Sequence, residues 1–420
     1  MSLSILFNAA FLTLLAVVTT ARLWLGFRQI RHVRDHRDGV PPAFRNRISL
    51  SEHQKAADYT CARTKLRMAQ TAVEALLLFA FTQGGWFDAL NRACASLFGT
   101  GTLHALSLAG SVLLIGAAAD LPLGLYGTFV VEARFGFNRV TPRLYALDLL
   151  RETLIAVLLG APVLMAAVWM MDSLGSFWWL WAWGAWMVFN VTLLALYPTF
   201  IAPLFNRFTP LPSGDVRTRV EGLLARCGFR SNGLFVMDGS KRSSHGNAYF
   251  TGFGGSKRVV FFDTLLERLN PSETEAVLAH ELGHYRRRHV MQRIGVLFVL
   301  SLLFLALLGG FKNAPWFYQG LGIPLAQPDS AVALILFMLV APVFSFPLQP
   351  VMSHYSRKHE FEADAYAASH AHAKDLVSAL VKLYQDNAAT LTPDPLHSAV
   401  YDSHPPAAVR IARLESLSAA

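Results

Sequence analysis

Two histidines four residues apart, with a glutamate beside the first, are the residues best arranged for chemistry in this chain: His280, Glu281 and His284. On a helix, both imidazoles leave the same face and can bind one divalent ion. Glu281 can then hold and deprotonate a water that the ion polarises. The spacing is the HExxH pattern of zinc hydrolases, which predicts one Zn²⁺ ion, with Glu281 as the general base.

The residues before this motif support a helix independently of it. Asn270 can cap the N-terminus, Pro271 suits the first helical position, and Glu273 can reach back as in a capping box. Gly283 is a weak helix former and leaves room for close approach at the motif. Two histidines at helical spacing also arise by chance, so the zinc prediction needs a third ligand and a suitable setting.

A candidate third ligand lies in the segment 356–367, which has the pattern of a helix. Glu360 and Asp364 share one face there, whereas Glu362 points away from both. Glu360 would complete a His/His/Glu zinc site with an open fourth position. Asp364 could accept the free N–H of a liganding histidine and so fix its tautomer. On spacing alone, a solvated ion-pair face that includes Arg357 remains an alternative.

Two further stretches hold candidate substrate contacts. His404 precedes a Pro-Pro pair that opens a short helix, and Arg410 lies six residues on, so both could donate to a developing oxyanion. A capping or surface role for His404 stays open. The stretch 247–253 reads as a strand just before the zinc helix, where an extended peptide could add along its edge. It reads equally well as a plain structural strand.

The composition indicates a membrane protein. Of 420 residues, 53% are hydrophobic and 15% charged, against about 25% charged in ordinary soluble domains. The three cysteines form no CxxC pair, and the amino terminus reads as a retained span, not a cleaved signal. A spanning helix needs about 20 apolar residues. Seven candidates meet this need: 3–25, 68–86, 103–131, 154–171, 174–200, 294–311 and 331–352.

The basic residues predict which side of the membrane each loop occupies. Nearly all Lys and Arg fall in 28–67, 132–152, 206–293 and the part after 352. Seven spans place all these segments on one side, which the positive-inside rule makes cytoplasmic, with the amino terminus outside. The net charge of +9 is thereby explained without a nucleic-acid partner. The zinc helix is predicted on the cytoplasmic side.

These observations predict a mainly α fold, an integral membrane protein of seven transmembrane helices with a small cytoplasmic α/β peptidase portion. Within that portion, 216–227 reads as a helix, and 234–237, 247–253 and 258–262 read as strands. The expected organisation has four parts: 1–205 with spans one to five, 206–293 with the HExxH helix, 294–352 with spans six and seven, and 353–420 with the third ligand.

Three stretches in order carry a resemblance to a known family: HELGH at 280–284, SRKHEFEADAYA at 356–367 and SHPPAAVRIARL at 403–414. Together they resemble the type I CAAX prenyl proteases (the sterile-twenty-four group), integral-membrane zinc metallopeptidases. The resemblance covers about 121–414 and agrees in span count. It implies a ring of seven long helices around a large internal chamber, with the zinc site facing inward.

The resemblance also implies roles for individual residues. The zinc ligands would be His280, His284 and Glu360, with Glu281 as the base. Asp364 matches an aspartate described as a proton donor or a partner of a ligand, and we favour the second role. The resemblance further places Asn247 and Tyr249 on the substrate strand, and His404 and Arg410 opposite the scissile carbonyl or its oxyanion.

The predicted function is a membrane-embedded zinc endopeptidase acting on a peptide or protein substrate, prenylated or not. One alternative is a bacterial quality-control protease for membrane proteins without prenyl specificity. Another is a membrane scaffold or channel with a structural zinc, and a transporter is a weaker third. High Ala, Arg and Leu usage suggests a bacterial inner membrane. The sequence does not indicate an oligomeric state.

Overall fold

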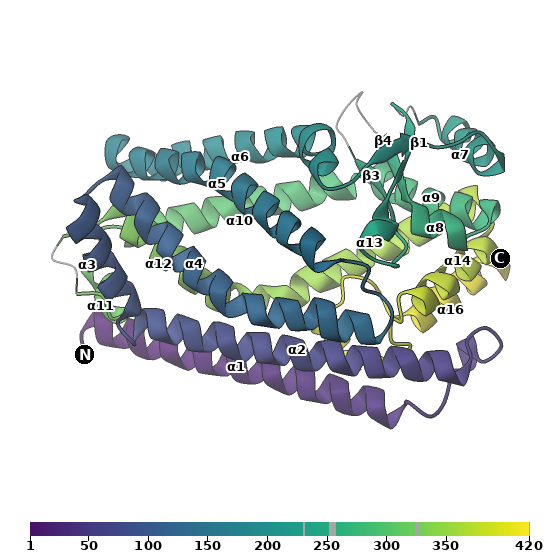
Figure 1. The fold of residues 1–420 in the computed structure, drawn as a ribbon, viewed down its shortest axis with the longest axis horizontal. Coiled ribbons are helices and arrows are strands. Elements are labelled where there is room, and N and C mark those ends of the chain that lie inside the picture. Colours follow the sequence, from purple (N-terminus) through teal and green to yellow (C-terminus); the bar gives the residue numbers. More distant parts are fainter. Residues whose placement is uncertain (230–231, 252–257, 325–326, 420) are drawn as a thin grey trace.

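Long helices lie side by side over most of the molecule, and a small sheet with shorter helices caps one end (Figure 1). This computed structural model describes residues 1–229, 232–251, 258–324 and 327–419. In the helix-rich part the elements are α1 Leu3–Asp35, α2 Leu50–Thr82, α3 Trp86–Phe98, α4 Thr102–Tyr126, α5 Pro142–Ser173, α6 Trp178–Leu196, α10 His289–Phe311, α11 Pro315–Gly320 and α12 Ser330–Ser345.

By length and composition, six helical segments of the described chain can cross a membrane: Leu3–Asp35, Thr102–Glu132, Pro142–Ser173, Gly175–Leu204, His289–Phe311 and Ser330–His370. The predicted span 68–86 lies in α2, whose apolar half carries Lys65, Arg67 and Glu74. Because of these charged residues, α2 is not among the six segments. The helix nevertheless lies along α1 for most of its length and returns the chain to the end where α1 began (Figure 1).

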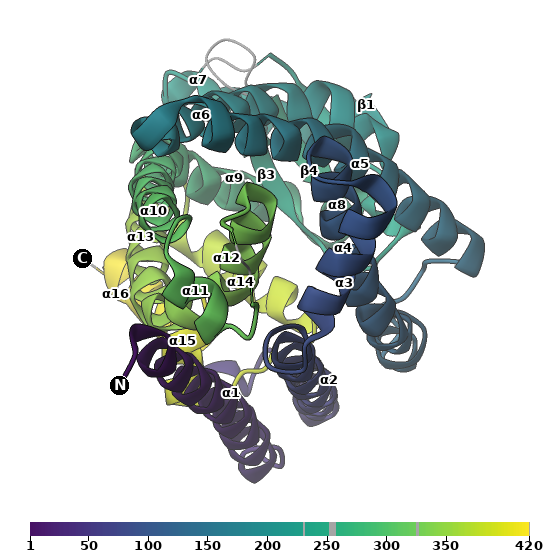
Figure 2. The same cartoon turned by 90° about the vertical axis from the view of Figure 1, so that its left-hand side faces the viewer.

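Seven long helices therefore alternate in direction, as the sequence predicts. Seen from one end, α12 lies inside a ring formed by the others (Figure 2). Trp86, the predicted end of the second span, instead opens α3 after a left-handed turn at Gly85. In the apolar window of α12, 44% of the residues are buried, against 6–17% in the other five. The α12 helix is thus packed inside the protein, whereas the others expose apolar side chains, as lipid contact requires.

The last span continues directly into the helix that carries the third candidate ligand. The α12 helix ends at Ser345, a 3-10 turn covers Phe346–Leu348, and α13 runs over Gln349–His370. Pro347 and Pro350 lie at this junction, and each lacks the N–H that an uninterrupted helix would use there. The bend turns α13 out of the span and toward the capping end of the molecule (Figure 1).

The capping end contains a four-stranded sheet in the order β1-β2-β4-β3. Its strands are β1 Phe208–Pro210, β2 Leu234–Met237, β3 Ala248–Thr251 and β4 Arg258–Phe262. The predicted strands at 234–237 and 258–262 are confirmed, and they pair in parallel. The third, β3, pairs antiparallel with β4 at an edge of the sheet; residues 252 and 253 of that prediction lie outside the described part.

Helices lie against this sheet and against one another at the capping end. They are α7 Asp215–Arg226, α8 Asp263–Arg268, α9 Pro271–Arg286, α14 Ala373–Asp386, α15 Pro395–Tyr401 and α16 Ala407–Ala419. All of them except α15 contribute to one apolar core. The α9 helix supplies Ala276, Leu278 and Leu282 to the core, all nearly inaccessible to solvent. Burying one such leucine stabilises the fold by about 1.5–3 kcal/mol, so α9 is held firmly along its length.

The start of α9 has the predicted cap. The Asn270 side chain accepts from the Glu273 N–H at 2.9 Å, and the Glu273 carboxylate accepts from the Asn270 N–H at 2.9 Å. Glu273 is itself buried and accepts from Ser378 and Lys382 of α14, each at 2.7 Å. Burial opposes its charge, but these partners keep the pKa of Glu273 below its ordinary value. One carboxylate therefore both caps α9 and joins it to α14.

Candidate active site

Two neighbouring helices, α9 and α13, bring the candidate metal ligands together. His280 and His284 lie one turn apart on α9, with their Nε2 atoms 3.2 Å apart. Glu360 of α13 places its carboxylate oxygens 3.5 Å from His280 Nε2 and 3.3 Å from His284 Nε2. One ligand atom from each of the three residues lies within 4.8 Å of the others. Residues 76 positions apart in sequence thus converge on one point.

A glycine allows the two helices to approach this closely. A Cβ atom on Gly283 would lie 2.8 Å from the Ala363 Cα atom and 3.0 Å from its carbonyl oxygen. Both distances are too short for ordinary packing, so a larger residue would push α13 away. Gly283 lies between the two histidines, and Ala363 follows Glu360 by one turn. The close approach therefore sets the distance between the ligands of α9 and the ligand of α13.

The chemistry of this group fits a divalent cation. Two imidazole nitrogens and a carboxylate face a common point, and the Glu360 side chain is almost fully buried. Its Oε2 atom has no hydrogen-bond partner among the described residues. A buried carboxylate oxygen without a partner is costly unless a cation binds it. Three ligands also leave a fourth position free, as in catalytic zinc sites; structural sites use four protein ligands.

A carboxylate holds the other nitrogen of His280. His280 Nδ1 lies 2.8 Å from Asp364 Oδ1. Arg410 of α16 donates to the same carboxylate from Nε at 2.8 Å and from Nη2 at 2.6 Å. Since Asp364 is ionised in such a pair, the His280 proton lies on Nδ1 and the Nε2 lone pair faces the metal position. All three side chains are buried.

Glu281, the predicted base, follows His280 on α9 and is partly buried. Burial raises the pKa of its carboxyl above the ordinary value, while His280 and His284 act in the opposite direction. A raised pKa brings a carboxylate nearer to the range in which it exchanges protons at neutral pH. The position and the direction of the shift both suit a group that takes a proton and returns it.

His404 and Arg410 differ in their surroundings, although the resemblance pairs them. His404 Nε2 lies 3.5 Å from Glu360 Oε2, and its side chain is 60% exposed. The Arg410 side chain is 5% exposed and is occupied by Asp364, with Nη1 3.7 Å from Glu360 Oε2. His404 is thus open to an incoming ligand beside the metal position, whereas Arg410 is fixed within the protein.

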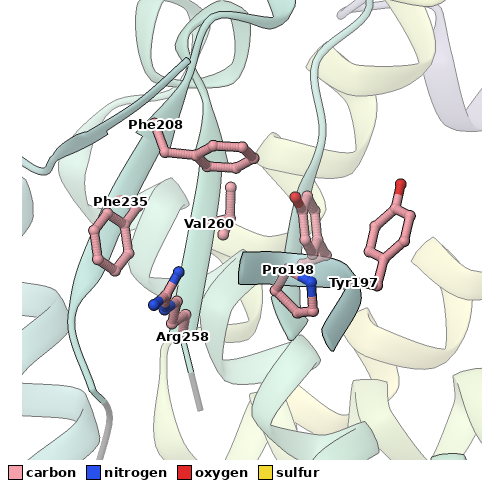
Figure 3. A pocket seen from close by; sticks show the side chains of 7 residues that line it. Tyr197, Pro198, Phe208, Phe235, Arg258 and Val260 are labelled. Atoms are coloured by element: carbon pink, nitrogen blue, oxygen red, sulfur yellow. The ribbon is translucent and has the colours of Figure 1, made fainter. Parts of the chain in front are cut away.

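The substrate-strand residues lie on β3. Asn247 precedes the strand with an exposed side chain, and Tyr249 is half-buried. The strand alternates, so Ala248 joins the core with α9 while Tyr249 faces the opposite side. There Tyr249 lines a pocket of about 10 Å³, room for about one water. The other lining residues are Tyr197, Pro198, Phe208, Phe235, Arg258 and Val260 (Figure 3).

Several contacts around the ligands join residues that are far apart in the sequence. Glu362 was predicted only to point away from Glu360 and Asp364; in the structure it lies 3.0 Å from His289 Nε2. Arg357 donates to the carbonyl oxygens of Ser398, Ala399 and Asp402 at 2.8–3.2 Å, just before His404. No local spacing signals these pairs, because their members lie at least 41 residues apart.

Comparison with known proteins agrees with this geometry. A family model described as the CAAX prenyl protease N-terminal region with five membrane helices matches residues 29–207, and the peptidase family M48 model matches residues 210–418. The CAAX prenyl protease 1 homolog of Arabidopsis thaliana is 35% identical over 383 residues, 88% of each chain. The chain belongs to peptidase family M48, among the type I CAAX proteases. It is therefore a multi-pass membrane metalloprotease.

Other relatives of this M48 protease match over most of their length. The CAAX prenyl protease 1 homolog of Caenorhabditis elegans is 32% identical and covers 98% of this chain and 99% of its own. A crystal structure of S. mikatae Ste24p aligns with a TM-score of 0.91 at 28% identity, covering 99% of both chains. The predicted fold class and enzyme class are confirmed, and the bacterial quality-control alternative is not favoured.

Proposed function

We propose that this M48 protease is a zinc endopeptidase that hydrolyses a peptide bond near the C-terminus of prenylated proteins with a CAAX ending. The observation that carries the proposal is the convergence of His280, His284 and Glu360 with Glu281 beside them. The names of the relatives, CAAX prenyl protease 1, support the substrate class. We further propose that the helix ring encloses a chamber with the site facing inward.

Each residue then has a defined task. When bound, zinc polarises the scissile carbonyl and acidifies a water molecule. Glu281 takes a proton from that water as its oxygen attacks the carbonyl carbon, and gives the proton to the leaving amine when the C–N bond breaks. His404 donates an N–H to the carbonyl oxygen as that oxygen gains negative charge. Asp364 and Arg410 hold His280 in the tautomer that turns Nε2 to the metal.

The substrate is proposed to bind as an extra strand. The β3 strand is the last strand of the sheet: it pairs with β4 on one side, and its other side is an edge. The strand also lies against α9. An extended peptide can add its main-chain hydrogen bonds to such an edge. Asn247, exposed at the start of β3, is positioned to contact that peptide. The excess of basic loops at this end favours a cytoplasmic site; a bacterial inner membrane remains a prediction from composition.

Two peptides of the same sequence test the proposal, one farnesylated on its CAAX cysteine and one without lipid. The purified protein and its Glu281→Ala variant are assayed with both, after metal analysis. We expect the farnesylated peptide to be cleaved faster, and the variant to retain metal while losing most activity. Equal cleavage of the two peptides would remove the prenyl part of the proposal. Wild-type hydrolysis by the zinc-loaded variant would remove Glu281 as the base.

A further inference from the structure

The two metal-binding histidines are supported in different ways. The Nδ1 atom of His280 contacts the carboxylate of Asp364. His284 instead faces another histidine: its Nδ1 lies 3.0 Å from Nδ1 of His289. The second ring nitrogen of His289, Nε2, lies 3.0 Å from Glu362 Oε2. A chain of two imidazoles and one carboxylate thus ends on a metal ligand.

Only one arrangement of protons satisfies this chain when a cation is bound. His284 Nε2 faces the ligand group, 3.3 Å from Glu360 Oε1, so the proton of the neutral ring lies on Nδ1. That Nδ1–H donates to His289 Nδ1, which must accept. The proton of His289 therefore lies on Nε2 and is donated to the Glu362 carboxylate. Each bond in the chain determines the tautomer of the next ring.

The backbone between the two histidines is shaped to bring them together. The α9 helix ends at Arg286 and α10 begins at His289. Between them Arg288 adopts φ 58°, a left-handed conformation that non-glycine residues rarely take. A conformation of this kind costs of the order of 1–3 kcal/mol and persists only where its surroundings require it. Here it reverses the chain so that the His289 ring returns to His284.

The His289 ring is also fixed from the side. It stacks on the His359 ring with centroids 3.9 Å apart and planes 4° apart, and both rings are buried. His359 Nε2 in turn lies 3.1 Å from Gln292 Oε1. The ring of His289 thus has a fixed plane from His359 and a fixed hydrogen-bond direction from Glu362. A side chain held so closely can orient the group that it contacts.

We propose that His289 is a positioning residue for the metal ligand His284, and that Glu362 holds His289 in the tautomer that accepts from it. The inference rests on the metal site of the proposed function, but not on the substrate. One helix, α13, would then supply a metal ligand, Glu360, and a carboxylate behind each histidine: Asp364 for His280 and Glu362 for His284.

Metal affinity tests this role without reference to peptide cleavage. The detergent-solubilised full-length chain is titrated with zinc against a competing chelator, and the visible spectrum of the Co²⁺-loaded protein is recorded. His289→Leu removes the acceptor, and we expect zinc binding weaker by about 10–100-fold with an altered Co²⁺ spectrum. His289→Asn keeps an amide oxygen near the place of Nδ1, and we expect most of the affinity to return.

His53→Leu is the matched control, because it makes the same change in a buried histidine of α2 whose ring contacts the His36 carbonyl oxygen and lies outside the metal site. We expect it to retain zinc affinity. Equal affinity in wild type and His289→Leu, or an equal loss in His53→Leu, would overturn the proposal. Should His289→Leu fail to fold, Glu362→Leu removes the acceptor for His289 Nε2–H at a side chain that is 35% exposed. It must then weaken zinc binding measurably, and unchanged affinity in that variant overturns the proposal.

Discussion

In this M48 protease, glycines in two membrane helices and a glycine at the metal site differ in the space around them. In α4 and α5, a Cβ atom on Gly110 or Gly160 would meet nothing described within 4 Å. At the crossing of α9 and α13, a Cβ atom on Gly283 would meet the backbone of Ala363 at 2.8 Å. These faces of α4 and α5 have room for a larger residue, whereas the metal site depends on close contact and paired polar groups.

The largest effect is expected at the chemistry itself. Glu281→Gln keeps the size of the side chain but removes the group that accepts the water proton. We expect peptide hydrolysis to fall by about 10²–10⁴-fold, the usual contribution of a general base. Zinc content and thermal stability should stay near those of wild type, because Glu281 is not among the three ligands. Hydrolysis rates, with metal analysis of the same sample, check this.

Gly283→Ala tests the comparison directly. The added methyl group cannot fit against Ala363, and overpacking of this kind costs about 1–3 kcal/mol. The displacement of Glu360 from the two histidines should lower activity by about 10²-fold and weaken zinc binding. Gly110→Ala and Gly160→Ala are the controls, expected to be neutral or stabilising by up to about 1 kcal/mol. If all three variants behaved alike, the contrast between the two regions would be lost.

Arg357→Ala addresses the loop that carries His404. The guanidinium bonds three carbonyl oxygens at the end of α15, so its loss frees the segment just before His404. We expect turnover to fall by about tenfold, less than the roughly 10²–10³-fold cost of removing an oxyanion donor outright, while zinc content is unchanged. His404→Ala should lose at least as much, and the double variant should add little. Full additivity of the two losses would separate Arg357 from His404.

The smallest effect is expected on stability, from the hydrogen bonds of Glu273 that connect α9 to α14. Because Lys382 and Ser378 hold the pKa of Glu273 below its ordinary value of 4.5, its stabilising contribution is complete above that pH. The contribution is lost as the pH falls through the lower, folded-state pKa. Glu273→Gln should therefore destabilise the protein by about 1 kcal/mol at pH 7, and less in acid. Unfolding temperatures at several pH values check this; a variant loss that grows in acid contradicts it.

The features predicted from sequence are those encoded locally. The capping box of Asn270 and Glu273 precedes α9 as expected, and the strands at 234–237 and 258–262 match β2 and β4. The membrane helices could be predicted from the length of their apolar stretches. The α2 helix is the exception, because its charged residues give it a hydropathy close to that of a surface helix. The convergence of Glu360 with the histidines was expected on the family motifs, since spacing alone favoured an ion-pair face.

What could not be predicted depends on tertiary contact. Glu362 contacts His289, which lies 73 residues away in the sequence. The contact depends on the left-handed conformation of Arg288, and no residue type near it predicts that conformation. Arg410 was expected beside the oxyanion, yet its partner in the fold is Asp364. Arg357 was considered part of a solvated face, although it holds the chain before His404. Long-range pairs of this kind produce no regular spacing in the sequence from which they could be predicted.

We propose that residues of α9 and α13 bind one catalytic zinc ion, and the amount of zinc held per chain is the decisive measurement. Zinc per chain is measured for the purified wild type and for Glu360→Ala after dialysis against a weak chelator. We expect one zinc per chain in the wild type and a large loss of zinc in the variant, together with loss of hydrolysis. An active wild type without metal, or a Glu360→Ala protein that holds zinc as tightly as the wild type, would contradict it.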